Sequence, residues 1–89
     1  LIYTNSFKKD LRLAKKRNYD MKKMEEVLTL LKSGKKLPRK YKDHQLKGNL
    51  SKFRELHIQP DWLLIYTKND TELILTLSRT GSHTELLKK

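Results

Sequence analysis

Residues 53–67 read FRELHIQPDWLLIYT, and most of the predicted architecture can be built outward from them. Two runs rich in Leu, Ile, Phe and Tyr flank Gln59-Pro60-Asp61, whose composition favours a tight turn. A second turn, at Lys68-Asn69-Asp70, leads into another apolar run. This pattern predicts an antiparallel meander of three short strands, at Phe53–Ile58, Leu63–Thr67 and Glu72–Ser78.

The residues before this meander follow a helical period instead. Thr4-Asn5-Ser6 are all good N-cap residues, and Leu1-Ile2-Tyr3 before them is short and β-prone. An apolar stripe at i, i+4 and i+7 then predicts an amphipathic helix that ends at Asn18-Tyr19-Asp20. The stripe consists of Phe7, Leu11 and Ala14.

A second helix is predicted between Asp20, which can cap it, and Ser33-Gly34, which can end it. Its apolar stripe consists of Met21, Met24, Val27, Leu28 and Leu31. We interpret residues 35–50 as a long polar loop with one short strand near Gln45-Leu46-Lys47. The predicted fold class is therefore α+β, with two N-terminal amphipathic helices that form a hairpin packed on a twisted antiparallel β-sheet.

The composition favours one folded domain. The chain has 89 residues, of which 24 are Leu, Ile, Val or Phe, enough for a single core of modest size. It has no Cys, which removes disulfides and thiolate metal sites. No run approaches the roughly 20 apolar residues that span a bilayer, and no signal-peptide pattern opens the chain. We expect residues 1–89 to form a single soluble domain in the cytoplasm.

Positive charge is concentrated in the first two thirds of the chain. The formal net charge is +11, and residues 8–54 contain 17 of the 21 Lys and Arg residues against five acidic ones. Lysines on a helix are often only a solvated face, but this excess favours a polyanion partner, because neutralised phosphates release counterions. An anionic membrane is a weaker alternative, because no helix combines bulky aromatic residues with its basic face. The predicted ribosome- and RNA-binding residues are Lys8, Lys9, Arg12, Lys15, Lys16 and Arg17.

Three histidines lie beside predicted turns or strand ends: His44 in YKDHQLKG, His57 in RELHIQPDW and His83 in SRTGSH. Imidazole can accept or donate a proton near neutral pH. RNA cleavage without a metal needs a base for the 2′-hydroxyl proton, an acid for the leaving 5′-oxygen and cations for the phosphorane charge. A small basic protein with three such side chains is therefore a candidate ribonuclease.

The order and spacing of these motifs resemble the YafQ type of bacterial toxin in the RelE/ParE superfamily. The motifs are YKDHQLKG at 41–48, FRELH at 53–57, IQPDW at 58–62 followed by LLIY, and RTGSH at 79–83. The resemblance covers essentially the whole chain and implies a RelE-like fold and a ribosome-dependent mRNA endonuclease neutralised by a cognate antitoxin. The other implied partners are the ribosome with its mRNA and, for the toxin-antitoxin complex, operator DNA; no cofactor, metal or membrane is implied.

The resemblance also assigns site residues. The family's active-site positions correspond to His44, His57, Asp61 and His83, and a basic position near the phosphate corresponds to Arg79. We predict that His44, Asp61 and His83 transfer protons and that the other two stabilise the phosphate; which group is base and which is acid stays open. The predicted products are a 2′,3′-cyclic phosphate and a 5′-hydroxyl. The residues assigned to substrate contact are Trp62, Lys47 and Arg54.

Each assignment has a purely structural alternative. A lone histidine near a strand end usually makes a structural hydrogen bond, and Asp61 can simply form its turn. Trp62 can be a core aromatic or can stack on a base beside the site. Arg79 either closes the edge of the core or faces a pocket, and we favour the pocket. Leu87 stands near the position where the family commonly has an aromatic residue, so codon preference can differ.

Three other functions stay open. A zinc site is disfavoured because no two histidines have the helical i, i+3 or i, i+4 spacing and there is no Cys. A ParE-like toxin would bind DNA gyrase without cutting RNA, and it would need no proton-transfer groups. A basic RNA-binding module would bind with a steep salt dependence and leave the RNA intact.

Overall fold

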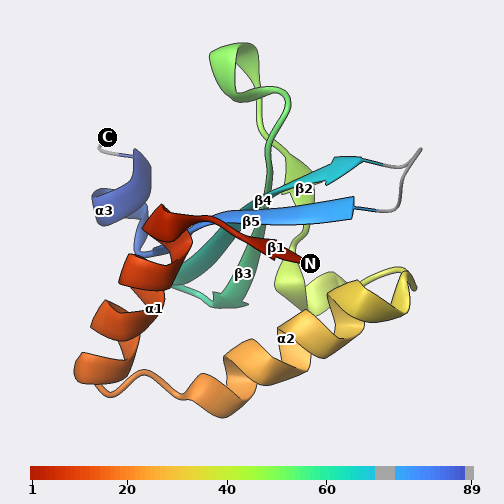
Figure 1. The fold of residues 1–89 in the computed structure, drawn as a ribbon. Helices are drawn as coiled ribbons and strands as arrows, with labels where there is room; N and C mark the ends of the chain where they lie inside the picture. Colours follow the sequence, from red (N-terminus) through yellow and green to blue (C-terminus); the bar gives the residue numbers. More distant parts are fainter. Residues whose placement is uncertain (70–73, 88–89) are drawn as a thin grey trace.

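The computed structural model describes residues 1–69 and 74–87, and only the backbone of His83 and Leu87. Within these residues a five-stranded sheet is covered on one face by two helices (Figure 1). The strands are β1 (Ile2–Tyr3), β2 (His44–Gln45), β3 (Arg54–Gln59), β4 (Trp62–Asn69) and β5 (Ile74–Gly81). The helices are α1 (Asn5–Lys16), α2 (Met21–Ser33) and α3 (His83–Leu87), with short 3₁₀ turns η1 (Arg39–Tyr41) and η2 (Gly48–Leu50).

Both long helices begin at predicted caps and α2 ends at the predicted one, whereas α1 ends at Lys16, shortly before the predicted break at Asn18-Tyr19-Asp20. Thr4 Oγ1 accepts the Phe7 N–H at 3.0 Å, and Asp20 Oδ1 accepts the Lys22 N–H at 3.1 Å. Gly34 ends α2 in the left-handed conformation, with φ at 72°, which glycine adopts without a steric penalty. The two amphipathic helices are thus confirmed.

The two helices do not form the predicted hairpin. α1 packs mainly on β5, whereas α2 packs on β3, so they diverge from their connection instead of pairing along their lengths (Figure 1). The sheet is wide enough to give each helix its own apolar surface, and this contact replaces the helix–helix contact. The apolar side chains that join helices and sheet in one core include Phe7, Ala14, Met24, Val27, Leu31, Leu56, Leu64 and Leu77.

The sheet has the strand order β1-β5-β4-β3-β2. The β2 to β5 portion is antiparallel, which confirms the meander, but β1 pairs with β5 in parallel, so the purely antiparallel prediction is wrong at this edge. The N-terminal strand is held there because Thr4 donates to the Leu77 carbonyl from both its N–H (3.2 Å) and its hydroxyl (3.1 Å). A two-residue strand has no periodicity that could reveal its partner.

The strand boundaries differ modestly from the predicted ones. β2 begins one residue before the predicted 45–47, and β5 continues past Ser78 to Gly81. Lys68 and Asn69 belong to β4 rather than to a turn. Asp70 of that predicted turn, and Glu72 at the predicted start of the third strand, lie outside the described residues.

Side chains alternate between the two faces of β3. Leu56 and Ile58 join the core under the helices, so Glu55 and His57 lie on the opposite face. The register places Glu55 opposite Ile65 of β4 and His57 opposite Leu63. Partners in adjacent strands share a face, which gives the sheet a second surface away from α1 and α2.

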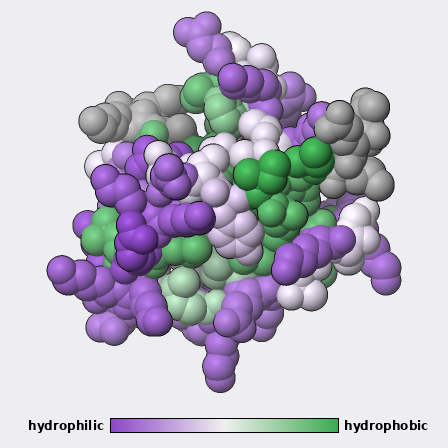
Figure 2. All heavy atoms as spheres, in the orientation of Figure 1, coloured by the Kyte–Doolittle hydropathy of each residue, from purple (hydrophilic) through white to green (hydrophobic). Residues whose placement is uncertain are grey.

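Figure 2 shows hydrophilic side chains over much of the visible surface, interrupted by a hydrophobic patch near the place where Figure 1 draws β1. Leu1 and Ile2 are exposed there, at 38% and 50%. Among the described residues, no helix has the length and apolar character needed to cross a membrane.

Candidate active site

Two adjacent dipeptides, Asp43-His44 and Arg54-Glu55, build the candidate site. The register of β2 and β3 places His44 opposite Glu55. Because successive side chains alternate, each dipeptide contributes one residue to each face of the sheet. His44, Glu55 and His57 thus meet on the face away from α1 and α2, and we call these three residues the histidine face.

The carboxylate of Glu55 is the centre of the histidine face. Its Oε1 atom lies 3.3 Å from His57 Nε2 and 3.8 Å from His44 Nε2, and the two imidazole centroids are 6.4 Å apart. Glu55 is only 2% exposed. A buried carboxylate is costly unless a positive group or hydrogen bonds compensate it, so Glu55 is suited to hold the two rings in place.

The other ring nitrogens face backbone carbonyls. His44 Nδ1 lies 2.6 Å from the Lys42 carbonyl oxygen, and His57 Nδ1 lies 3.3 Å from that of Pro60. A carbonyl only accepts, so each Nδ1–H donates and each Nε2 is left toward Glu55. Each ring therefore lies between a backbone carbonyl on one side and the Glu55 carboxylate on the other.

Asp61 lies in the turn that follows β3. The carbonyl that receives His57 Nδ1 belongs to Pro60, so the ring is tied to the turn in which Asp61 stands exposed. The β3–β4 register shifts between His57 and Gln59, and the resulting bulge turns the strand end just before this carboxylate. The structure thus brings Asp61 to the same end of the hairpin as His57.

A capping box fixes the backbone of His83. The Ser82 N–H donates to Glu85 Oε1 and the Glu85 N–H donates to Ser82 Oγ, both at 3.2 Å, which starts α3 at His83. Gly81, two residues earlier, pairs with Leu63 opposite His57, so α3 begins near the end of that cross-strand row. His83 was predicted to transfer a proton, and the side-chain atoms that would do so lie outside the described part of the structure.

Arg79 does not present a free guanidinium to a pocket, contrary to the prediction. Its Nε donates to Asp10 Oδ2 of α1 at 2.7 Å, and the same oxygen accepts the Thr80 N–H at 3.1 Å. The hydrogen bond that Arg79 donates to Asp10 raises the pKa of Arg79. The register places Arg79 opposite Ile65, which lies opposite Glu55, so Arg79 lies two strands away from the histidine face.

The three residues assigned to substrate contact lie apart from one another. Trp62 is 2% exposed, donates from Nε1 to Thr80 Oγ1 at 2.9 Å and meets the Tyr19 ring edge to face, so stacking on a base is wrong and the core alternative is right. Arg54 lies on the helix side of the sheet, paired with Asp43. Lys47 is exposed at the start of η2, on a loop that projects from the sheet (Figure 1).

The predicted basic face of α1 is exposed along the whole helix and its C-cap. It consists of Lys8, Lys9, Arg12, Lys15, Lys16 and Arg17. Arg17 also pairs with Glu85 of α3 at 2.7 Å, which ties this helix to the segment that carries His83.

Glu55 and Asp43 are the site residues that sequence reasoning missed. A glutamate in an alternating strand normally indicates a solvent-facing position, and an aspartate in a polar loop draws no attention. The i, i+2 spacing of Glu55 and His57 was the available signal, because it places both side chains on one face of a strand. Ser82-x-x-Glu85 was the corresponding signal for α3.

Comparisons with known proteins agree with this fold. The family described as "Bacterial toxin of type II toxin-antitoxin system, YafQ" matches residues 1–88. The mRNA interferase toxin YafQ of Escherichia coli strain K12 is 42% identical over 85 residues, which cover 94% of this chain and 90% of that protein. This chain therefore belongs to the YafQ family of type II toxin-antitoxin toxins.

Two solved structures extend the comparison. The E. coli DinJ-YafQ toxin-antitoxin complex matches with a TM-score of 0.87 and 42% identity, over 96% of this chain and 92% of that one. A metal-bound toxin from Helicobacter pylori matches with a TM-score of 0.86 and 44% identity, over 94% and 93%. Likeness at this level over nearly the full length confirms the RelE-like α+β fold.

Imidazole and carboxylate side chains, such as those of the histidine face, can also bind metal ions. In the part of the chain that the structure describes, no three His, Asp or Glu side chains are arranged to hold a metal ion. His44 and His57 both direct Nε2 at one oxygen of the Glu55 carboxylate.

Proposed function

We propose that this chain is an mRNA interferase that cuts mRNA on the ribosome and is neutralised by a cognate antitoxin. Family membership supports the toxin assignment, and the relative from E. coli is named an mRNA interferase. The observation that carries the catalytic part is the convergence of His44 and His57 on the buried carboxylate of Glu55. A protein that only binds RNA or gyrase has no need to bury a carboxylate between two imidazoles.

The proposed reaction uses the RNA's own 2′-hydroxyl. A base removes its proton, the oxygen attacks the adjacent phosphorus, the bond from phosphorus to the 5′-oxygen breaks, and an acid gives that oxygen a proton. The products are a 2′,3′-cyclic phosphate and a 5′-hydroxyl. Candidate proton-transfer groups are His44, Asp61 and His83, and no step passes through a metal.

His57 and Glu55 have supporting roles in this proposal. The His57 ring is less exposed than that of His44, with 17% of its side chain accessible against 50%, and it is held at both nitrogens. As an imidazolium it would stabilise negative charge on the phosphorane. Glu55 is a positioning residue, since it lies beneath the rings and fixes their orientation.

The basic face of α1 is the proposed contact with ribosomal RNA. Its exposed cations lie on the other side of β5 from the histidine face, where they can bind the ribosome without occupying the candidate active site. The solved DinJ-YafQ complex supports an antitoxin partner for this chain as well, and operator DNA is a proposed ligand of the resulting complex.

Mapping of RNA ends on programmed ribosomes tests the proposal. Purified wild type and His83→Ala protein would each be incubated with a defined mRNA, with and without ribosomes, and with 1,10-phenanthroline, which removes transition metals but leaves Mg²⁺ for the ribosome. We expect a ribosome-dependent cut with a cyclic phosphate, resistant to the chelator and lost in the variant. The absence of any cut would favour gyrase binding or simple RNA binding instead.

A further inference from the structure

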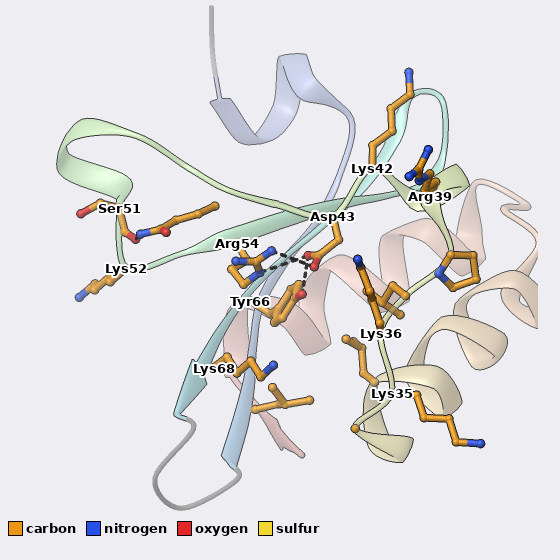
Figure 3. Close-up of a pocket in the computed structure, with 16 residues that line it drawn as sticks. Lys35, Lys36, Arg39, Lys42, Asp43, Ser51, Lys52, Arg54, Tyr66 and Lys68 are labelled. Carbon is orange, nitrogen blue, oxygen red and sulfur yellow. Dashed lines mark hydrogen bonds and ion pairs between the residues drawn. The ribbon is translucent and has the colours of Figure 1, made fainter.

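A wide basic groove lies on the opposite side of the sheet from the histidine face. It has a volume of about 960 Å³. One wall is the segment from Gly34 to Asp43 after α2, and the other is formed by β3, β4 and the loop before β3 (Figure 3). The basic residues that line it are Lys35, Lys36, Arg39, Lys42, Lys52, Arg54 and Lys68.

Asp43 is the one acidic side chain among the lining residues, and it is neutralised locally. Its carboxylate accepts from Arg54 Nη2 at 2.9 Å and from the Tyr66 hydroxyl at 2.5 Å. The hydrogen bond that Arg54 donates to Asp43 raises the pKa of Arg54. Burial, and after it the hydrogen bond that the Tyr66 hydroxyl donates to Asp43, raises the pKa of Tyr66. The acid therefore holds the two walls together and cancels little of the surrounding positive charge.

Three cations near this cluster are available to a ligand. The structure pairs none of Lys36, Arg39 and Lys42 with an acidic side chain among the residues it describes, and all three are exposed. In Figure 3, Lys36 extends toward the Asp43 cluster, while Lys42 and Lys52 stand at the rim with their amines directed outward. Several unpaired cations spaced around one hollow suit a polyanion with regularly spaced charges.

The lining also indicates which polyanion fits. Tyr66 is the one aromatic residue in the lining and is only 2% exposed, so the described groove offers no surface on which a base could stack. Single-stranded RNA is usually held by such stacking, whereas duplex RNA is recognised through phosphates and shape. An amphipathic acidic peptide would need apolar contacts, and the apolar lining is limited to Leu31, Leu37, Pro38 and Leu75.

We propose that this groove binds the phosphate backbone of duplex RNA, as a second RNA contact separate from both the histidine face and α1. The proposal deepens the proposed function, because a toxin that acts on the ribosome meets duplex RNA around the mRNA. Contact on this side would leave the histidine face free for the strand that is cut.

Binding of a fluorescein-labelled 20-base-pair RNA duplex tests the groove without requiring cleavage. The test variant is Lys36→Gln/Lys42→Gln/Lys52→Gln, which removes cations from both walls. The matched control, Lys22→Gln/Lys23→Gln/Lys32→Gln, removes the same charge from exposed positions of α2 outside the groove. Circular dichroism checks that each variant folds.

The groove variant is expected to weaken duplex binding about tenfold and to lower the slope of log K against log salt by about two to three. The matched control should change affinity by about twofold or less. Equal losses in the groove variant and its control would overturn the proposal. So would unchanged duplex binding together with lost binding of an acidic peptide such as poly-glutamate. This experiment measures binding and not cleavage. If the protein failed to cut mRNA in the cleavage assay, the proposed function would be refuted, but the binding result would still decide whether the groove binds duplex RNA.

Discussion

The histidine face and the basic groove lie on opposite sides of the same two strands, and each is organised around one carboxylate. Glu55 is buried between two imidazoles, whereas Asp43 is held by Arg54 and Tyr66. On the histidine face the carboxylate keeps titratable rings next to each other. In the groove it secures the walls, and Lys36, Arg39 and Lys42 beside it pair with no acidic side chain among the described residues. Because successive side chains of a strand point to opposite faces, two dipeptides can place candidate catalytic groups on one face of the sheet and a candidate binding site on the other.

Of the two carboxylates, the one on the histidine face should have the larger effect on activity when it is removed. Glu55→Gln leaves an acceptor of the same shape without the charge that orients both rings, so ribosome-dependent cleavage should fall about 100-fold. Single-turnover cleavage of a defined mRNA measures this. Asp43→Asn makes the same chemical change on the other face and should slow cleavage far less.

A double variant distinguishes positioning from a general loss of structure. If Glu55 acts through His57, then Glu55→Gln/His57→Gln should be about as slow as the slower single variant, because residues that act as a unit are not additive. Rate losses that multiply in the double variant would contradict the assignment of Glu55 as a positioning residue.

The carboxylate of the groove should matter mainly for stability. Asp43→Asn weakens its hydrogen bonds with Arg54 and Tyr66 and should lower the free energy of unfolding by about 2 kcal/mol. Tyr66→Phe removes a single bond and should cost about 1 kcal/mol. Urea unfolding measures both. If Asp43→Asn slowed cleavage without any loss of stability, this would contradict the assignment of cleavage to the histidine face and of a stabilising role to Asp43.

The capping box of α3 gives a smaller effect. Ser82→Ala removes the side-chain acceptor of the Glu85 N–H and should cost about 1 kcal/mol in the free energy of unfolding. Thr84→Ala, at an exposed position of the same helix, is the control and should be nearly neutral. Equal effects of the two substitutions would mean that the cap does not hold α3.

The pH dependence of stability gives the smallest effect. The Ser82 N–H, and after it the Arg17 guanidinium, lower the pKa of Glu85 below its ordinary value of 4.5. The folded state therefore binds fewer protons than the unfolded one, so this stabilisation is complete above the unfolded pKa and is lost as pH falls through the folded pKa. Between about pH 5 and about pH 3, wild type should lose more stability than Glu85→Gln. Parallel curves for the two proteins would contradict this contribution.

Much of the fold was predictable because its signals are local. Thr4, Asp20 and Gly34 mark helix ends through their own side chains or backbone freedom, and the turn at Pro60 marks the hairpin between β3 and β4. The parallel pairing of β1 and the divergence of α1 from α2 were not predictable. Both depend on surfaces that exist only once the sheet has formed.

The site was harder to predict because residue type alone does not say which face a side chain occupies. Trp62 follows a turn, and a residue at such a position can either pack in the core or stack on a base. In the structure its Nε1 donates to the Thr80 hydroxyl, a partner that the sequence does not reveal, and the ring lies in the core. Arg79 lies inside β5, which continues to Gly81, and Asp10 of α1 accepts a hydrogen bond from it across 69 residues of sequence. Only the resemblance to the YafQ family assigned His44 and His57 to one site. The strand register, which the sequence does not reveal, places Glu55 beside them.

The most direct test of the two-sided arrangement is a saturation curve of cleavage on programmed ribosomes for wild type, His57→Gln and the groove variant Lys36→Gln/Lys42→Gln/Lys52→Gln. For His57→Gln we predict a maximal rate at least about 100-fold lower with little change in the half-saturating toxin concentration. For the groove variant we predict a half-saturating concentration about tenfold higher, with the maximal rate within about threefold of wild type. The same change in both variants, or an unaltered curve for His57→Gln, would contradict the separation of cleavage and RNA binding on opposite faces of the sheet.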